Sequence, residues 1–287
     1  MAKCIVYLDA GHAKVTAGKR SPDGSLLEWE FNNDMQYRIK KRLEAHGITV
    51  VLVNPNPDKG SEVGLTARAT TANNHWVKAG KPSAVFVSLH ANAAGGGWST
   101  ASGTETFVAK NASSKSVNCA TYVQKQIVAD LGFKNRGVKK ENFTVIYKAN
   151  MPSILIEYGF YSNKVECEAL KSSAKRGLMC EATVKGICKY FGIAYKASST
   201  SSTNNSTSST SNGFVKGEYN KNVKVNADVL SIRNGRGTKF TKIGSLTKGK
   251  IVTIWSIDTD KDGSLWGSFR YDSNNIGFIH MGYIALC

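Results

Sequence analysis

One low-complexity segment in the second half of the chain most constrains how this sequence can fold. Every residue from Ser198 to Asn212 is Ser, Thr or Asn, so the segment has no apolar side chain to bury and is expected to stay solvated. A single hydrophobic core cannot continue through such a segment. We therefore expect a linker over residues 196–215, with one domain of residues 1–195 and a smaller domain of residues 216–287 on either side of it.

Before the linker, apolar runs typical of strands alternate with helical patterns. The run CIVYLDA is followed by a segment in which apolar residues recur every four positions from Phe31 to Leu43, and Gly47 then favours a helix end. The alternation continues with strands predicted at 48–53, 84–90, 103–109 and 153–160 and helices at 65–77, 116–131 and 164–191. This order predicts an α/β domain with a mostly parallel twisted sheet flanked by helices, and functional residues are expected at the carboxyl ends of its strands.

After the linker the pattern changes to short apolar runs separated by turn-forming residues. The runs IVTIWSI, LWGSFRY and NIGFIHMGYI lie between turn segments such as NGRG and DKDGS. Regular short strands with turn signals predict a small all-β barrel or sandwich. We expect at least half of the four aromatic residues Trp255, Trp266, Tyr271 and Tyr283 to help build its core.

The chain is strongly basic, with a formal net charge of +17. This charge predicts anionic partners, whether nucleic acid, lipid headgroups or a wall polymer such as teichoic acid. Residues 1–195 carry 26 Lys and Arg against 15 Asp and Glu, and residues 196–287 carry 12 against 6. Because the excess is spread over both parts, it argues against the concentrated basic stripe of a nucleic-acid groove.

The cellular context also follows from patterns of residues. The first residues, MAKCIVYLDAGH, lack the apolar length and cleavage site of a secretory signal, so we expect synthesis in the cytoplasm without a signal peptide. No apolar run approaches the ~20 residues of a membrane span, which predicts no membrane insertion. The six cysteines form no CxxC pair, and we expect buried reduced thiols.

Four residues are candidates for chemistry. His12 and His90 follow predicted strands, Glu157 lies inside an apolar run, and Glu28 opens the first predicted helix. Two imidazoles and a carboxylate can bind zinc and leave one position open for water, and a second carboxylate can act as a general base. A histidine at a strand end is often only hydrogen-bonded, and a glutamate in a first helical turn often only complements the helix dipole. Glu157 is less easily explained in this way, because a carboxylate in an apolar strand is costly to bury unless it is paired.

Six motifs in order give a resemblance to a known family. YLDAGHAK, LLEWEFNN, LTARATTANN, VFVSLHANA, FKNRGV and MPSILIEYGFYSN together resemble the zinc-dependent N-acetylmuramoyl-L-alanine amidases of the amidase-3 family. The resemblance covers nearly all of residues 3–191.

The resemblance implies a role for each of the four candidates. His12, Glu28 and His90 correspond to the family's zinc ligands, with Asn32 marking the register of Glu28, and Glu157 corresponds to its catalytic carboxylate. Zinc would lower the pKa of a water molecule and Glu157 would take its proton. The resulting hydroxide would attack the amide carbonyl between the lactyl group of muramic acid and L-alanine, and Glu157 would return the proton to the leaving nitrogen.

Some positions depart from the family pattern. Glu30 competes with Glu28 as a ligand, although it lies two residues off the expected register. Relatives commonly have glycine after the first ligand histidine, and a basic residue after an FxVL strand. This chain has Ala13 at the first place, and Tyr147 followed by Lys148 at the second.

Residues 222–287 resemble bacterial SH3-type wall-binding modules, with Ser231, Ile232 and Arg233 where Asn-Val-Arg is usual. Together the two resemblances imply a phage endolysin with zinc as its cofactor. Its expected partner is the peptidoglycan of a Gram-positive wall carrying teichoic acid. No nucleic-acid partner is expected, and the sequence specifies no oligomeric state.

Other readings remain open. A bacterial autolysin would use the same chemistry, and a zinc peptidase cutting within the stem peptide would use the same site. A wall-binding protein without catalysis is a further alternative, as is a basic nucleic-acid-binding protein, which would hold no metal.

Overall fold

A computed structural model of the chain describes residues 4–59, 61–197, 214, 217–260, 262–272 and 276–286. The chain divides into two compact units, Met1–Ser198 and Ser199–Cys287. Most of the linker expected at 196–215 lies outside the described residues, so its extent stays a prediction. Among the described residues, every helix is too short or too polar to span a membrane.

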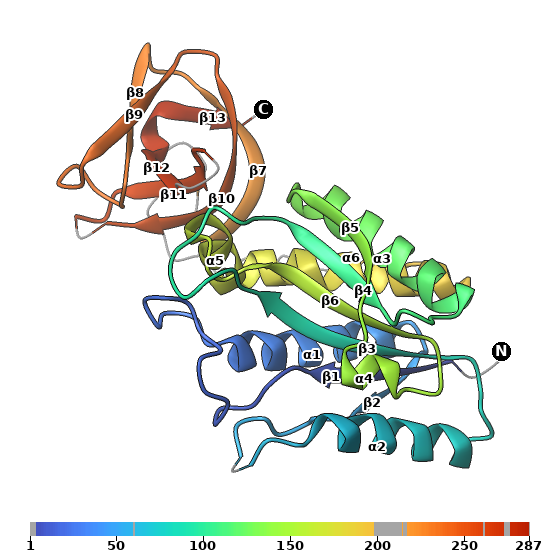
Figure 1. The fold of residues 1–287 in the computed structure, drawn as a ribbon. Helices are drawn as coiled ribbons and strands as arrows, with labels where there is room; N and C mark the ends of the chain where they lie inside the picture. Colours follow the sequence, from blue (N-terminus) through green and yellow to red (C-terminus); the bar gives the residue numbers. More distant parts are fainter. Residues whose placement is uncertain are drawn as a thin grey trace. The chain divides into compact units, whose positions relative to one another are not determined.

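The first unit contains one six-stranded sheet (Figure 1). Its strands run in the order β2-β1-β3-β6-β4-β5, and all neighbours are parallel except β6 and β4. This confirms the predicted mostly parallel sheet. The strand bounds are β1 (Ile5–Ala10), β2 (Thr49–Leu52), β3 (Ala84–Asn92), β4 (Thr104–Val108), β5 (Asn135–Lys140) and β6 (Ser153–Phe160).

Helices cover both faces of this sheet (Figure 1). The helices are α1 (Glu28–Ala45), α2 (Leu65–Lys78), α3 (Ser114–Leu131), α4 (Thr144–Tyr147), α5 (Lys164–Lys171) and α6 (Ser173–Phe191). Helices α1, α3, α5 and α6 pack against one face, and α2 and α4 against the other. The four-residue apolar repeat of α1, from Phe31 to Leu43, is completely buried, as the amphipathic pattern predicts.

Two elements of the first unit differ from the sequence-based expectation. The segment that corresponds to the FxVL strand of relatives forms helix α4, in which Val145 and Ile146 both bury in the same apolar cluster. Neighbouring residues of a strand would point to opposite faces of the sheet. The strand β5 was not predicted, since its sequence NRGVKK is mostly polar and it lies at the edge of the sheet.

The second unit is a seven-stranded antiparallel sheet in the order β13-β7-β10-β11-β12-β8-β9. A short 3-10 helix, Met281–Tyr283, precedes the last strand. The strands are β7 (Gly217–Val225), β8 (Val229–Arg233), β9 (Lys242–Thr247), β10 (Ile251–Thr259), β11 (Leu265–Arg270), β12 (Ile276–His280) and β13 (Ile284–Leu286). The predicted all-β second domain is therefore confirmed as an antiparallel sheet.

The core of the second unit is more aliphatic than expected. Of the four aromatic residues proposed for it, Trp266 is buried and Trp255 is half-buried. Tyr271 and Tyr283 are 38% and 53% exposed, so the expectation that at least half of the set builds the core is wrong. Aliphatic side chains fill that space, chiefly Val223, Ile232, Ile254, Ile257 and Ile279.

Candidate active site

The register of the parallel sheet brings three candidate residues to one edge. In the pairing of β1 with β3, Ala10 lies opposite Leu89, so the chain leaving β1 at Gly11 and His12 passes beside His90. On the other side of β3, His90 lies directly opposite Glu157 of β6. The carboxyl ends of three adjacent strands therefore place both imidazoles and this carboxylate together.

Glu28 completes the group from the first residue of α1. Its Oε1 lies 3.0 Å from His90 Nδ1, and its Oε2 lies 3.3 Å from His12 Nε2. The backbone N–H of Ala91 also donates to Oε1 at 3.1 Å. Glu28 is 2% exposed whereas Glu30 lies on the exposed side of the helix, so the geometry selects Glu28 over its competitor.

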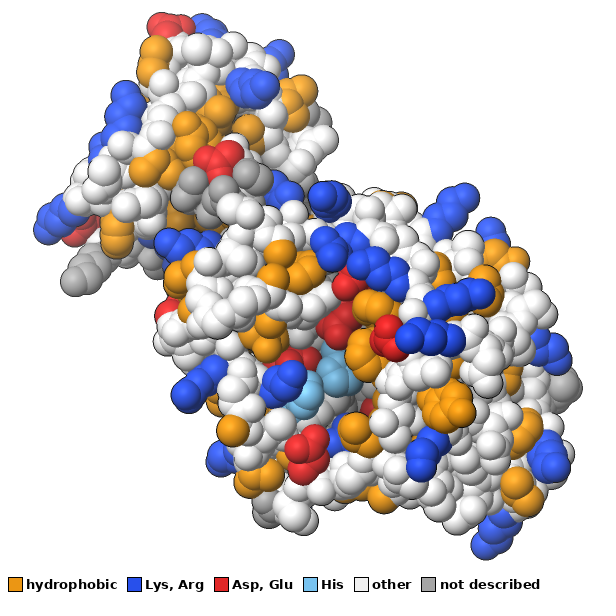
Figure 2. Space-filling model, in the orientation of Figure 1, with side chains coloured by type: hydrophobic (Ala, Val, Ile, Leu, Met, Phe, Trp, Pro, Cys, Tyr) orange, Lys and Arg blue, Asp and Glu red, His pale blue; other side chains and the backbone are white. Residues whose placement is uncertain are grey.

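The three residues form a cluster that could hold a metal ion. One donor atom each from His12, Glu28 and His90 lies within 4.8 Å of the other two. Figure 2 shows histidine side chains in a hollow of the surface with acidic side chains beside them. Tetrahedral ligands bound at the usual zinc distances lie about 3.3 Å apart, close to the nitrogen–oxygen distances seen here. The set of two nitrogens and one carboxylate is one that catalytic zinc sites use.

The turn that carries His12 has an unusual backbone held by side chains from two other segments. His12 has a φ of 64°, in the left-handed region that few residues other than glycine adopt. Asn32 Nδ2 donates to the Gly11 carbonyl at 2.9 Å, and Asn54 Nδ2 donates to the carbonyls of Ala10 and His12 at 2.7 and 3.1 Å. These bonds hold the first imidazole in place at the cost of a strained backbone.

A buried ion pair stabilises the end of β1. Arg68 of α2 is completely buried, and its guanidinium contacts Asp9 Oδ1 and donates to the Ala10 carbonyl, both at 3.1 Å. Ser88 donates to the other oxygen of Asp9 at 2.7 Å. Asp9, Arg68 and Ser88 lie in the motifs YLDAGHAK, LTARATTANN and VFVSLHANA, but the motifs by themselves indicate no role for them. The asparagine and arginine contacts arise between segments far apart in the chain, so spacing alone does not reveal them.

Gly11 is required by the position of the second imidazole. A Cβ atom at this position would lie 2.1 Å from His90 Cε1, a distance that no side chain can accept without moving. The packing of His90 against bare backbone therefore explains the glycine in the AGH turn.

We expect Gly11→Ala to displace His90 and to reduce both metal affinity and hydrolysis, because a misplacement of about 1 Å at a reacting site can cost roughly 100-fold in rate. Metal content by mass spectrometry and the rate of hydrolysis measure the two effects. Gly97→Ala is the matched control, since a Cβ there would meet no atom within 4 Å. Equal losses in both variants would contradict this account of Gly11.

The surroundings of Glu28 and Glu157 shift the pKa values of the two carboxyl groups in opposite directions. Burial alone would raise the pKa of Glu28, but the hydrogen bonds with His12 and His90 outweigh it and hold that pKa well below its usual value. Burial raises the pKa of Glu157 to about 8, and the nearby Glu28 carboxylate adds to the effect. Environments that push two carboxyl groups in opposite directions are typical of sites where one stays ionised and the other exchanges a proton.

The neighbour of Glu157 on β4 shows how unusual Glu157 is. Glu105 lies opposite it in the strand pairing and is buried, but it contacts Arg136 at 2.6 Å, pairs with Lys139 and accepts a hydrogen bond from Asn92 at 2.7 Å. Those partners outweigh burial and lower the pKa of Glu105. Glu157 Oε2 is buried and has no hydrogen-bond partner among the described residues. A buried polar atom without a partner is a candidate contact for a bound molecule, ion or water.

A cleft of about 430 Å³ lies over this group. The four candidates line this cleft, so a ligand bound in it could reach them, and the other lining residues are both apolar and polar. Besides the four, its lining includes Lys19, Leu65, Ala91, Asn92, Ala93, Asn142, Phe143, Thr144, Val145, Leu155 and Tyr161. The arrangement is suited to metal-assisted hydrolysis, in which a metal polarises a carbonyl group and a carboxylate moves a proton.

Comparison with known proteins is consistent with this chemistry. The sequence profile of the family described as N-acetylmuramoyl-L-alanine amidase matches residues 6–189. The N-acetylmuramoyl-L-alanine amidase LytC of Bacillus subtilis is 30% identical over 187 residues, which are 65% of this chain but 35% of LytC. The endolysin of Bacillus phage SPP1 is 28% identical over 201 residues, covering 67% of this chain and 68% of that protein.

A solved structure shows the same fold. The crystal structure of N-acetylmuramoyl-L-alanine amidase from Clostridium difficile 630 superposes with a TM-score of 0.61 at 28% identity, covering 67% of this chain and 98% of that one. The family match lies within the first unit, which carries the cleft and all four candidate residues. This chain spans about a third of the length of LytC.

Proposed function

This chain belongs to the N-acetylmuramoyl-L-alanine amidase family, and from that premise we propose that it hydrolyses the amide bond between N-acetylmuramic acid and the L-alanine of the stem peptide in peptidoglycan. The observation that carries the proposal is the convergence of His12, Glu28 and His90 beside Glu157, whose buried Oε2 has no hydrogen-bond partner among the described residues. A cleft open to solvent above the group gives a polymer access to it.

The same residues support zinc as the cofactor. Two imidazoles and one carboxylate leave a fourth position free. The buried Oε2 of Glu157, for which the described part of the chain offers no hydrogen-bond partner, lies on the strand next to that of His90. When bound here, zinc would supply Lewis acidity that lowers the pKa of water and stabilises negative charge on the amide oxygen. His12, Glu28 and His90 would hold it.

The protein's own residues would carry out the proton transfers. Glu157 accepts the proton of the attacking water, whose oxygen forms the new bond to the lactyl carbonyl carbon. As the carbon–nitrogen bond breaks, Glu157 donates that proton to the alanine nitrogen, so the products are a lactyl carboxylic acid and a peptide with a free amino terminus. Burial raises the pKa of Glu157, which favours a carboxyl group that can hold the proton between the two transfers.

The experiment that tests this function is end-group analysis of digested walls. Incubation of purified Gram-positive peptidoglycan with the full chain should release new alanine amino termini and leave the glycan strands intact. New reducing sugar ends would indicate a glycosidase. New amino termini from inside the stem peptide would indicate the peptidase alternative, and either result would contradict the proposal.

We also propose a finer role, that of a phage endolysin in which residues 216–287 form an SH3-type module that binds the wall. The similarity to the SPP1 endolysin supports the phage role, and the compact antiparallel sheet of the second unit supports a separate module. A module joined to a catalytic domain raises the local enzyme concentration on a polymeric substrate. The similarity to LytC favours the alternative, a bacterial autolysin with the same chemistry.

A further inference from the structure

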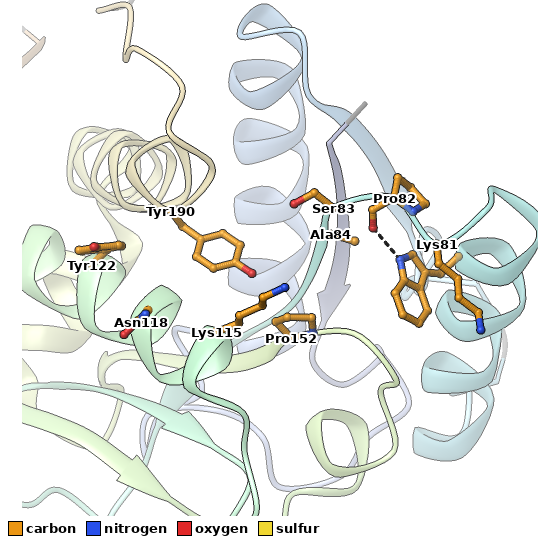
Figure 3. A pocket seen from close by; sticks show the side chains of 10 residues that line it. Lys81, Pro82, Ser83, Ala84, Lys115, Asn118, Tyr122, Pro152 and Tyr190 are labelled. Carbon is orange, nitrogen blue, oxygen red and sulfur yellow. Dashed lines mark hydrogen bonds between the residues drawn. The ribbon is translucent and has the colours of Figure 1, made fainter. Parts of the chain in front are cut away.

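A second cleft lies at the opposite edge of the catalytic sheet. It has a volume of about 590 Å³ and is formed where α2 ends, β3 and β6 begin, and α3 and α6 pass alongside (Figure 3). Its lining residue Ala84 opens β3, whereas His90 lies six residues further on, about 20 Å away at roughly 3.3 Å per strand residue. The two clefts share no lining residue.

Positive charge gathers at this second cleft without a balancing carboxylate. Lys81 and Lys115 line it and are exposed, and no Asp or Glu is among its described lining residues. Neither ammonium group has an ion-pair partner among the described residues. Lys115 also lies in the first turn of α3, where the helix dipole disfavours a cation. Local helix energetics therefore do not explain a lysine at this position.

Aromatic rings form the half-buried part of the same cleft. Trp76, Tyr122 and Tyr190 come from three different helices and are each partly exposed. The Trp76 indole is fixed by a hydrogen bond from Nε1 to the Pro82 carbonyl at 2.9 Å (Figure 3). Lys189 Nζ lies 5.2 Å from the ring centroid of Tyr122, which adds a third cation near the cleft. Aromatic rings of this kind can pack against the C–H faces of sugars or polyols.

The backbone at Lys81 carries strain that a smaller residue would avoid. Its φ is 53°, and the residue before it, Gly80, is also left-handed with a φ of 80°. Glycine would adopt this conformation at Lys81 without steric cost, whereas an L side chain there is strained. The turn therefore presents a lysine side chain where the backbone geometry favours glycine.

We propose that this second cleft binds the phosphodiester groups of a polyol-phosphate polymer attached to the wall, of the teichoic-acid type. Lys81 and Lys115 would contact the phosphates, and the aromatic rings would contact the polyol or sugar units between them. This proposal rests on the proposed function in one respect: both require that the chain acts at the cell wall. Binding here would hold the catalytic unit on its substrate independently of the second unit.

The test is a calorimetric titration of the full chain with soluble poly(glycerol phosphate). The double variant Lys81→Gly/Lys115→Gln should bind about tenfold more weakly, since exposed ion pairs each contribute modestly, and the wild-type affinity should fall with added salt. Lys125→Gln/Lys134→Gln is the matched control, because it removes two charges from exposed positions outside the cleft and should leave the affinity unchanged. Lys81→Gly alone should weaken binding without lowering the Tm.

Three outcomes would overturn the proposal. One is unchanged affinity in the Lys81→Gly/Lys115→Gln variant. Another is equally strong competition by a single-stranded oligonucleotide, which would indicate a general polyanion surface. The third is lysine-dependent binding of glycan strands freed of phosphate polymer. Release of alanine amino termini from stripped walls should stay at the wild-type level in the double variant. A wild-type chain that released none would refute the proposed hydrolysis and leave the binding result standing.

Discussion

The variant Glu157→Gln should lose hydrolysis of peptidoglycan almost completely while still binding zinc. The substitution keeps the shape of the side chain and removes its ability to exchange a proton, and general acid–base catalysis contributes about 10²- to 10⁴-fold to a rate. The carboxyl group is outside the cluster of His12, Glu28 and His90, so the metal donors are unchanged. Release of alanine amino termini measures the rate, and mass spectrometry of the purified chain measures the metal.

Two results would count against this role of Glu157. A fully active Glu157→Gln variant would exclude the carboxylate from proton transfer. Loss of zinc together with activity would instead assign Glu157 to the metal-binding set. Glu105→Gln is not a suitable control, because Glu105 holds Arg136 and Lys139 and its loss would disturb the sheet edge. Glu30→Gln is suitable, since Glu30 is exposed and outside the cleft lining.

The second large effect is expected for Glu28→Ala, which should lose zinc and activity together. The Glu28 carboxylate lies between the two imidazoles, and both nitrogen–oxygen distances are within 3.3 Å. Loss of a residue that only orients a ligand typically reduces metal affinity 10- to 100-fold, and loss of a ligand should cost at least as much. The measurements are zinc affinity by competition with a chromophoric chelator and hydrolysis with zinc in excess.

Glu30→Ala provides the comparison, because it removes a glutamate from the same helical turn. It should retain the wild-type zinc affinity and rate, and a reversal of the two results would show that Glu30 is the ligand. The Tm of both variants without metal separates loss of a ligand from loss of the fold. Glu28→Ala should stay folded, since α1 is anchored by its buried apolar face from Phe31 to Leu43.

Much of the fold follows from local patterns in the sequence. The apolar residues of α1 recur every four positions, as expected when one face of a helix is buried. The strands β1, β3 and β6 are continuous apolar runs, as expected when both faces of a strand are buried. These patterns predict the helix and the three strands. Their alternation then predicts the parallel sheet. The strand β5 shows no such apolar pattern, so the sequence does not predict it. It lies at an edge of the sheet and is stabilised by pairing with β4, and its polar residues give no sign of that pairing.

The candidate site was predictable only in part. Glu157 is conspicuous as a carboxylate in an apolar strand, and the resemblance to the family suggested both histidines and Glu28. Spacing alone could not choose between Glu28 and Glu30. That choice depends on how α1 is rotated against the sheet, which places the first residue of the helix against both imidazoles and leaves Glu30 exposed.

The supports of the site could not be predicted from spacing. Asn54 and Arg68 bond to the carbonyls at the end of β1 from segments more than 40 residues away, and Gly11 is needed only because His90 packs against it. Each of these contacts depends on tertiary packing. The positive φ of His12 also could not be predicted from spacing, because hydrogen bonds from distant segments of the chain hold this part of the backbone.

The most direct test of the central claim is digestion of peptidoglycan in water enriched in ¹⁸O, followed by mass analysis of the muramic-acid product. We predict one ¹⁸O atom in the lactyl carboxyl group, an unlabelled alanine amino terminus on the released peptide, and neither product with Glu157→Gln. Label in a sugar hydroxyl group or in a carboxyl group inside the stem peptide would show that water attacks a different bond. That result would contradict the assignment of this site to amide hydrolysis at muramic acid.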